Sequence, residues 1–171
     1  HVVISELQVG VTGSAADEFV ELYNPTAAPV NIGGWVLQYR SATGAAYQNT
    51  ATIPMGTMLG ARRYFLITSV RNASGATGFT GSVSSDLATS GALGLSGTAG
   101  HVRVGPELST SVTDMNAVDT LGYGTTAAGP EGSAAPVPSS GPLASIERKA
   151  NSMSTAASMS WKRYSAALSL R

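Results

Sequence analysis

The clearest hydrophobic pattern in the chain is a two-residue alternation near its start. In the segment Phe19–Tyr23 aromatic or acidic residues alternate with aliphatic ones, so an extended chain places the two sets on opposite faces. The dipeptide Asn24-Pro25 then ends the strand, because proline lacks an amide hydrogen and disfavours a helical conformation in the residue before it. The pattern predicts a β-strand that ends at Asn24, a turn, and a second strand that opens at Trp35.

The same alternation recurs along the chain and predicts a protein built of strands. Trp35, Leu37 and Tyr39 share one face of their strand, and we expect Trp35 in the core. The other predicted strands are Val2–Leu7, a short strand around Ala51–Ile53, Ala61–Ser69, a hairpin of Ala92–Leu95 with Val102–Val104, Val118–Tyr123 and a strand around Ile146. We therefore expect an all-β sandwich with long loops rich in Gly, Ser and Ala.

The low-complexity stretch before the last predicted strand bears on domain organisation. Residues 125–142 are rich in Ala, Gly, Pro and Ser and resemble a linker. A domain boundary there would separate the strand around Ile146 from the core, and 171 residues suit one domain. We expect a single domain over residues 1–171, with residues 160–171 as an extending C-terminal strand.

Several of these segments together resemble the lamin tail domain, an immunoglobulin-like β-sandwich found in nuclear lamins and in many secreted bacterial proteins. The most specific part of the resemblance is an aromatic-x-Glu-Leu-x-Asn strand followed by a small-residue turn into Gly-Trp. The segments that carry it are Val2–Glu6, Phe19–Asn24, Gly34–Leu37, Gly60–Ile67, Gly94–Val104, Val118–Gly124 and Ala144–Lys149. The resemblance implies an immunoglobulin-like fold and a non-catalytic role. Secreted bacterial relatives often continue with an Asp- and Asn-rich segment, whereas residues 150–159 here have no acidic side chain.

Charge and composition exclude several classes of partner. The net charge is zero and only 12% of residues are charged, so the chain lacks the long-range field that attracts nucleic acid or an anionic membrane. There is no cysteine, which excludes disulfides and thiolate chemistry. No apolar run reaches the length of a membrane span.

A chain that begins at His1 rather than Met favours removal of a secretory signal peptide, and we expect a secreted or cell-surface protein.

Two acidic residues suggest catalysis at first sight. Glu6 and Glu21 lie within neighbouring predicted strands, so the pair resembles a general acid and base. The alternative is structural, because strand carboxylates accept hydrogen bonds from loop amides or pair with arginine. No nucleophile or oxyanion site accompanies them in the sequence. We favour the structural alternative and expect no enzymatic activity.

Two sets of residues are candidate metal ligands. A free N-terminal His1 with His101 would form a copper-binding histidine brace, and a copper-binding redox protein is therefore an alternative function. Asp114, Asn116 and Asp119 offer oxygen ligands for calcium. For Asp114 and Asn116 the alternative is side chains that cap their own turn, and for the histidines it is a solvated terminus and a surface strand residue. Neither copper nor calcium is expected as a cofactor.

Other polar groups carry weaker signals. Asn72-Ala73-Ser74 matches a glycosylation acceptor. Arg62, Arg63 and Arg103 would together form a basic face, but isolated strand arginines usually cover apolar surface with their stems and leave the charged group in water.

The C-terminal tail suggests a more specific functional hypothesis, namely self-association. Trp161, Lys162, Arg163 and Tyr164 are candidate interaction residues, since an extended tail can add to the exposed sheet edge of a neighbouring subunit. We expect a non-catalytic extracellular interaction or structural module whose partners are proteins, including copies of itself in a homo-oligomer or filament. A second alternative is a targeting module of a larger secreted hydrolase.

Overall fold

The structure is a computed structural model that describes residues 1–10, 14–69, 78–128, 132–138, 144–148 and 161–165. Strands form the six-stranded sheet in the order β12-β11-β1-β2-β7-β8 and the four-stranded sheet in the order β10-β9-β4-β5. The six-stranded sheet comprises β1 (Val3–Gln8), β2 (Phe19–Tyr23), β7 (Tyr64–Thr68), β8 (Leu87–Ala88), β11 (Ala144–Arg148) and β12 (Trp161–Ser165). The four-stranded sheet comprises β4 (Val36–Ser41), β5 (Gln48–Thr52), β9 (Gly100–Gly105) and β10 (Asp119–Tyr123).

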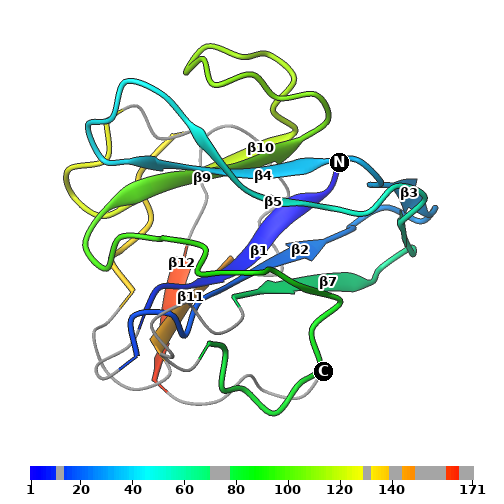
Figure 1. The fold of residues 1–171 in the computed structure, drawn as a ribbon, viewed down its shortest axis with the longest axis horizontal. Helices are drawn as coiled ribbons and strands as arrows, with labels where there is room; N and C mark the ends of the chain where they lie inside the picture. The colour runs from blue at the N-terminus through cyan, green and yellow to red at the C-terminus, as the bar shows by residue number, and fades with distance from the viewer. Residues whose placement is uncertain (11–13, 70–77, 129–131, 139–143, 149–160, 166–171) are drawn as a thin grey trace.

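The two sheets stack face to face as the layers of a sandwich (Figure 1). Neighbouring strands are antiparallel except for the short β7–β8 pair. A small third sheet pairs β3 (Val30–Asn31) with β6 (Met58–Leu59) at one end of the sandwich. The expected all-β, immunoglobulin-like sandwich is confirmed. Within the described residues, no helix is long and apolar enough to cross a membrane.

The core lies between the two sheets and follows the predicted alternation. Val20 and Leu22 of β2 and Leu37 of β4 are completely or almost completely buried, and each belongs to one continuous apolar cluster. Burying each such side chain contributes about 1.5–3 kcal/mol relative to leaving it in water. The alternation in Phe19–Tyr23 therefore both predicts the strand and sets which residues form the core.

Asn24 ends β2 as the sequence predicts and also fixes the turn that follows. Its amide nitrogen donates to the carbonyl oxygens of Ala28, Leu59 and Gly60 at 2.9, 3.1 and 3.0 Å. Its side-chain oxygen accepts from the backbone amide of Thr26 at 3.0 Å. A completely buried asparagine with these partners joins the turn after β2 to the end of β6.

Three local expectations differ from the structure. Trp35 lies just before β4, in a turn where its amide bonds to Ile32 O, and it packs half-buried against the margin of the core. Residues 92–95, the first half of the predicted hairpin, form no strand. The second half, Val102–Val104, lies in β9, which pairs with β4 and β10. The short strand predicted around Ala51–Ile53 is β5, which begins earlier, at Gln48.

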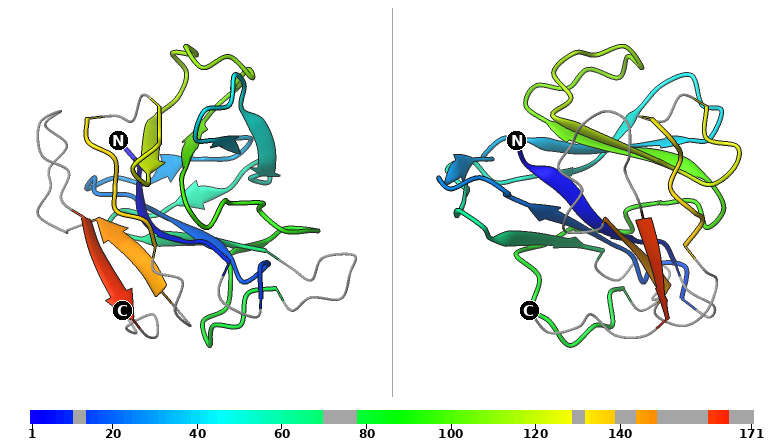
Figure 2. Two further views of the ribbon diagram at one scale, coloured as in Figure 1. Left: turned by 90° about the vertical axis from the view of Figure 1, so that its left-hand side faces the viewer. Right: turned by 180° about the vertical axis from the view of Figure 1, so that it is seen from behind.

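The C-terminal strands complete the six-stranded sheet. Strand β11 pairs with β1 through the register Leu7 opposite Ile146, and β12 pairs with β11 through Ile146 opposite Arg163. Figure 2 shows β12 in red beside β11 in orange, at the margin of the sheet. The first half of the tail thus pairs within its own chain, and β12 becomes an edge strand.

Candidate functional site

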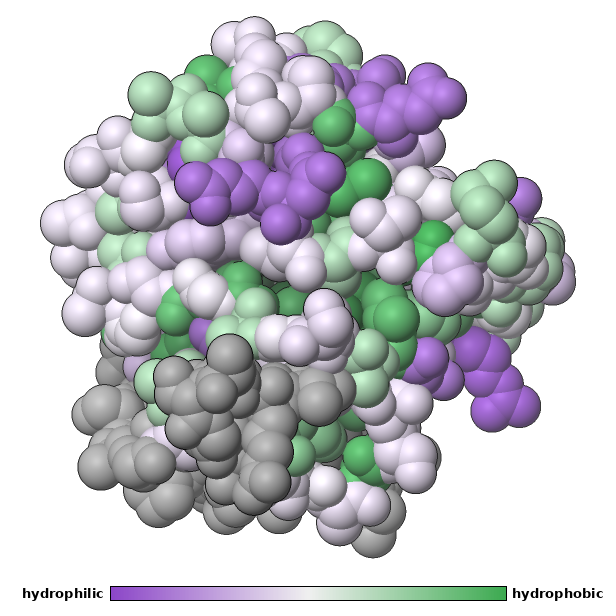
Figure 3. All heavy atoms as spheres, in the orientation of Figure 1, coloured by the Kyte–Doolittle hydropathy of each residue, from purple (hydrophilic) through white to green (hydrophobic). Residues whose placement is uncertain are grey.

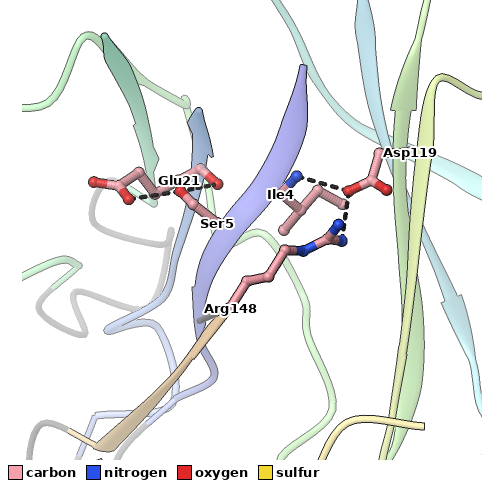
Figure 4. Close-up of polar contacts among 5 residues, drawn as sticks. All are labelled: Ile4, Ser5, Glu21, Asp119 and Arg148. Carbon is pink, nitrogen blue, oxygen red and sulfur yellow. Dashed lines mark hydrogen bonds and ion pairs between the residues drawn. The ribbon is translucent and has the colours of Figure 1, made fainter. Parts of the chain in front are cut away.

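One buried ion pair links the two sheets. Asp119 on β10 and Arg148 on β11 approach with Oδ2 and Nη2 2.9 Å apart, and their side chains are 1% and 4% exposed. The same Asp119 oxygen accepts the backbone N–H of Ile4 at 2.7 Å. Figure 4 shows the three groups converging from β10, β11 and β1. Burial raises the pKa of Asp119, against the opposing effects of Arg148 and the Ile4 amide.

The Asp119 carboxylate also accepts the backbone amide of a residue in β1. The described pairing of β1 with β11 begins at Glu6 and runs to Gln8, so it stops short of Ile4, whose amide Asp119 accepts. The pairing of β1 with β2 is irregular between Ile4 and Glu6, where a β-bulge redirects the backbone. The ion pair is therefore a structural junction between the sheets, in which Asp119 Oδ2 accepts from both Ile4 and Arg148, whereas Oδ1 is buried without a hydrogen-bond partner among the described residues.

The two glutamates that suggested acid–base catalysis are indeed neighbours. Glu6 lies in register with Glu21 on one side and with Glu147 on the other. Ser5 Oγ donates to Glu21 Oε1 at 2.6 Å (Figure 4), and Ser145 Oγ donates to Glu6 Oε1. Lys162 continues the same row on β12. Each glutamate is half-buried with hydrogen-bond partners, which is the structural arrangement that the sequence favours.

Asp17 and Glu18, just before β2, tether two loops that the sequence does not identify as connected to them. Glu18 is 1% exposed, and its carboxylate accepts the amides of Gly94 and Leu95 at 2.9 and 2.7 Å. Asp17 accepts from Thr80 Oγ1 at 2.6 Å. Burial raises the pKa of Glu18, and the backbone hydrogen bonds oppose that shift. The predicted hairpin at residues 92–95 is instead a loop held by Glu18.

The outer face of the four-stranded sheet holds two buried arginines, Arg40 and Arg103, whereas the sequence pattern predicts that Arg103 leaves its charged group in water. Arg103 is 2% exposed, and its guanidinium lies 3.8 Å from the ring centroid of Tyr47. Arg40 lies 5.2 Å from the same ring. Arg103 Nε also donates to Gln38 Oε1 at 2.8 Å. The cation–π contacts and hydrogen bonds keep these groups out of water, so Arg103 does not join exposed Arg62 and Arg63 in a basic face.

The proposed histidine brace is not assembled in the structure. His101 is completely buried and alternates along β9 with the core residues Val102 and Val104, so it lies on the outer face of the four-stranded sheet. His1 is exposed and precedes β1 of the other sheet. Burial and the nearby Arg40 lower the pKa of His101. His101 is therefore buried on the face of the four-stranded sheet that points away from the core, whereas His1 precedes the first strand of the six-stranded sheet.

The candidate calcium ligands also separate. Asp114 Oδ2 accepts from both Ser109 Oγ and Ser109 N at 2.6 Å, and Oδ1 accepts from Asn116 N at 2.8 Å. These hydrogen bonds, led by the Ser109 hydroxyl, lower the pKa of Asp114 to about 2. Asp119 points instead toward Arg148 (Figure 4). Asp114 and Asn116 stabilise their own turn, and in the described part of the chain no group of three acidic or histidine side chains could hold a metal ion.

The remaining candidates lie at sheet edges or outside the described residues. Trp161, Lys162, Arg163 and Tyr164 are in β12, which ends the six-stranded sheet. Asn72-Ala73-Ser74 lies outside the described residues.

A groove separates the other edge of that sheet from β5. It has a volume of about 370 Å³. Figure 3 shows hydrophobic residues gathered across the middle of the face that is turned to the viewer. The groove is lined by Asn49, Thr50, Ala51, Thr52, Leu87, Ala88, Thr89 and Ser90.

Comparison with known proteins identifies the family of most of the chain. The Lamin Tail Domain family model matches residues 1–125, which include β1 through β10. No curated protein matches the chain.

Proposed function

Because the chain belongs to the lamin tail domain family, whose members are non-enzymatic immunoglobulin-like domains, we propose that it is an extracellular interaction module that assembles with copies of itself. The proposal has three parts. The first is that the chain acts by binding protein rather than by catalysis. The second is that the binding surface for another copy is the free edge of β12. The third is that the chain acts outside the cell.

The position of β12 is the observation that carries the proposal. This strand ends the six-stranded sheet, with β11 on one side and no strand on the other in the part of the chain that the structure describes. An edge strand presents unpaired N–H and C=O groups along its free side. Such a row accepts a strand from another chain through main-chain hydrogen bonds. The sequence Trp161–Ser165 carries two aromatic residues, which favour extended structure.

The weak charge of the chain supports self-association. With 10 basic and 10 acidic side chains among 171 residues, two copies meet little long-range repulsion. Native edge strands often avoid aggregation through charged side chains, and Lys162 and Arg163 are the charges available on β12. If two β12 strands pair antiparallel about a two-fold axis, the contact closes as a dimer; if β12 meets a different edge, the contact propagates as a filament.

A proline scan of β12 tests the proposal while keeping β11 paired. Along an edge strand, successive amides alternate between the paired side and the free side. One of the substitutions Lys162→Pro and Arg163→Pro therefore removes an amide that faces outward, and the other removes an amide that bonds to β11. We expect the outward-facing substitution to abolish oligomers with the fold intact, as measured by light scattering and circular dichroism.

The control is the exposed loop residue Thr125, as Thr125→Pro. This variant should assemble like the original chain. Oligomers that persist in both β12 variants, or that are absent from the original chain at all concentrations, would exclude β12 as the assembly edge.

The extracellular part of the proposal follows from the resemblance to secreted bacterial proteins of the family. Expression of the full gene in its own host, followed by separation of medium, cell surface and cytoplasm, tests it. Recovery of the chain only from the cytoplasm would contradict this part and leave the assembly edge untouched.

A further inference from the structure

A histidine is buried without hydrogen bonds on the outer face of the four-stranded sheet. His101 lies on β9, which is paired with β4 on one side and β10 on the other. Its side chain is completely buried, and neither ring nitrogen has a hydrogen-bond partner among the described residues. Buried polar side chains almost always have such partners. This imidazole is an exception that the packing of the sandwich does not require, because it points away from the core.

Two loops cover the His101 ring, one after β4 and one after β10. Backbone groups of Ser41, where β4 ends, and of Ala128, after β10, lie next to the ring. The Ala128 amide donates to Ala42 O at 3.0 Å, which joins the two loops to each other. Because β9 is held by strands on both sides, water reaches the ring only if the loops move away from the sheet.

Arg40 binds both loops and also lies beside the imidazole. Its Nη1 donates to Gly44 O at 2.8 Å, and its Nη2 donates to Ala128 O at 2.9 Å. In the register of β4 and β9 it is the residue opposite His101, and its charge acts on the ring. A proton on His101 would therefore place a second positive charge next to Arg40 in a site without water, which is unfavourable.

No described carboxylate balances a charged imidazole at this place. Besides His101, the titratable or charged side chains described on this face of the sheet are Arg40, Arg103 and Tyr47. The residue opposite His101 on β10 is Gly122. The Asp114 carboxylate acts on Arg103 rather than on the imidazole. Residues 42–46 and 124–128 contain no acidic side chain, so the loops supply no counter-charge.

The loops can leave the sheet without unfolding the sandwich. Apart from Gly124, residues 42–46 and 124–128 are exposed or half-buried, and they contribute nothing to the continuous apolar cluster between the sheets. Segments with few buried apolar contacts open locally at a lower free-energy cost than the whole domain.

We propose that residues 42–46 and 124–128 form an acid-sensitive cover over His101, which leaves the sheet when the imidazole is protonated while both sheets stay folded. Release of the cover hydrates the imidazolium and separates the two loops that Arg40 joins. The device is distinct from self-association, because it lies on the four-stranded sheet and β12 belongs to the other sheet.

The direction of the pH dependence follows from the closed state. Burial and then the charge of Arg40 lower the pKa of His101 below 6.5, against the opposing effect of nearby backbone groups. With the cover open, the imidazole is hydrated and its pKa returns toward 6.5. The open form therefore binds more protons, and its population relative to the closed form rises as pH falls below 6.5, by up to about tenfold between pH 7.5 and pH 5.5.

Hydrogen exchange of the full chain, resolved by residue and repeated in low concentrations of urea, tests the inference. The Ala128 amide reports the contact between the loops, since it donates to Ala42 O. After correction for the intrinsic exchange rate, its protection should fall by up to about tenfold from pH 7.5 to pH 5.5. Local release exposes little surface, so the protection at pH 5.5 should hardly depend on urea, whereas global unfolding becomes steeply more frequent with urea.

Three variants assign the acid response to His101. His101→Gln retains a polar side chain that does not titrate, and its Ala128 protection should be the same at both pH values. His1→Ala should keep the acid response of the original chain. Glu131→Gln alters the first acidic residue after Ala128 in the sequence and should also keep that response.

Several outcomes would overturn the inference. They are Ala128 protection that does not change with pH in the original chain, a loss at pH 5.5 that depends on urea as steeply as global unfolding does, an undiminished acid response in His101→Gln, and its disappearance in Glu131→Gln. The first two are read on the original chain, so they decide the inference even if a variant fails to fold.

Discussion

At the residue scale, the ion pair between Asp119 and Arg148 links a strand of each sheet and so helps to hold the two sheets together. The pair is almost fully buried, so each charge depends on the other, and Asp119 also satisfies the Ile4 amide. A buried ion pair is not in itself a large source of stability, because desolvation offsets much of the attraction. Removing one partner is costly because the other is then left as a buried, unpaired charge.

Substitution Arg148→Met tests this dependence. It retains an apolar stem of similar length and removes the charge, so the free energy of unfolding at pH 7 should fall by about 3–5 kcal/mol. Urea denaturation measures the change. The double variant Arg148→Met with Asp119→Asn removes both charges and should recover much of the loss, since an amide oxygen can still accept from Ile4. A single variant as stable as the original chain would contradict the account.

The same variant has a predicted pH dependence. Without Arg148, the folded-state pKa of Asp119 lies still further above the ordinary value of 3.8, because burial already raises it. The folded state then binds more protons than the unfolded state between the two values, and stability falls as pH rises through that window. The deficit of Arg148→Met should therefore shrink as pH is lowered toward 4. A deficit that does not vary with pH would show that Asp119 is not its source.

For His101 the predicted change of stability with pH has the opposite sign. Its folded-state pKa is lowered from 6.5 by burial and by Arg40, so the unfolded state binds more protons just below pH 6.5. The contribution of His101 to stability is present above that pH and is lost as pH falls toward the lowered value. Comparing chemical denaturation at pH 7.5 and pH 5, we expect His101→Leu to be less sensitive to acid than the original chain. His1→Ala, which alters an exposed imidazole, should keep the original sensitivity.

At the element scale, the strands that the alternation predicts and the loops that it does not predict have different physical origins. Phe19–Tyr23 and Tyr64–Thr68 are recognisable because one face of each enters the core. Strand β8 and the pair β3–β6 have two residues each, which is too short for a period to appear. Their positions are fixed by tertiary contacts, which leave no local pattern.

The loop tethers before β2 are predicted to act separately. Glu18→Ala removes the acceptor for the amides of Gly94 and Leu95, and Asp17→Ala removes the acceptor for both the backbone amide and the hydroxyl of Thr80. Each substitution should cost about 1–3 kcal/mol. Hydrogen exchange resolved by residue should show faster exchange at Gly94 and Leu95 only in the first variant, and at Thr80 only in the second. Equal effects of both variants on all three amides would contradict separate tethers.

The burial of polar residues in strands is the feature that is predicted least well from the sequence. Gln38, Arg40 and Arg103 alternate with core residues and therefore appear to face solvent, but Tyr47 and the segment around Ser109 cover them. The pairing of Asp119 with Arg148, 29 residues apart, likewise follows from strand order rather than from any local motif. Spacing did place Asp114 and Asn116 in one turn. The turn-capping alternative is confirmed for the Asp114 side chain, which accepts from the backbone amides of Ser109 and Asn116, whereas Asn116 contributes its backbone amide.

At the scale of the whole molecule, the fold presents its unpaired strands on two sides. The six-stranded sheet ends at β12 on one side and at β8 on the other, where β5 of the second sheet faces it across the groove. The sandwich and the family of residues 1–125 follow from sequence pattern and resemblance. Which strands would lie at the edges did not, because edge position depends on the order of strands in space.

Sedimentation velocity of the original chain and the outward-facing β12 proline variant, over a hundredfold range of concentration, tests the central claim most directly. If β12 joins copies of the chain, the weight-average sedimentation coefficient of the original chain rises with concentration, and that of the variant remains at the monomer value. A concentration-independent monomer for the original chain, or the same rise in both proteins, would contradict the claim.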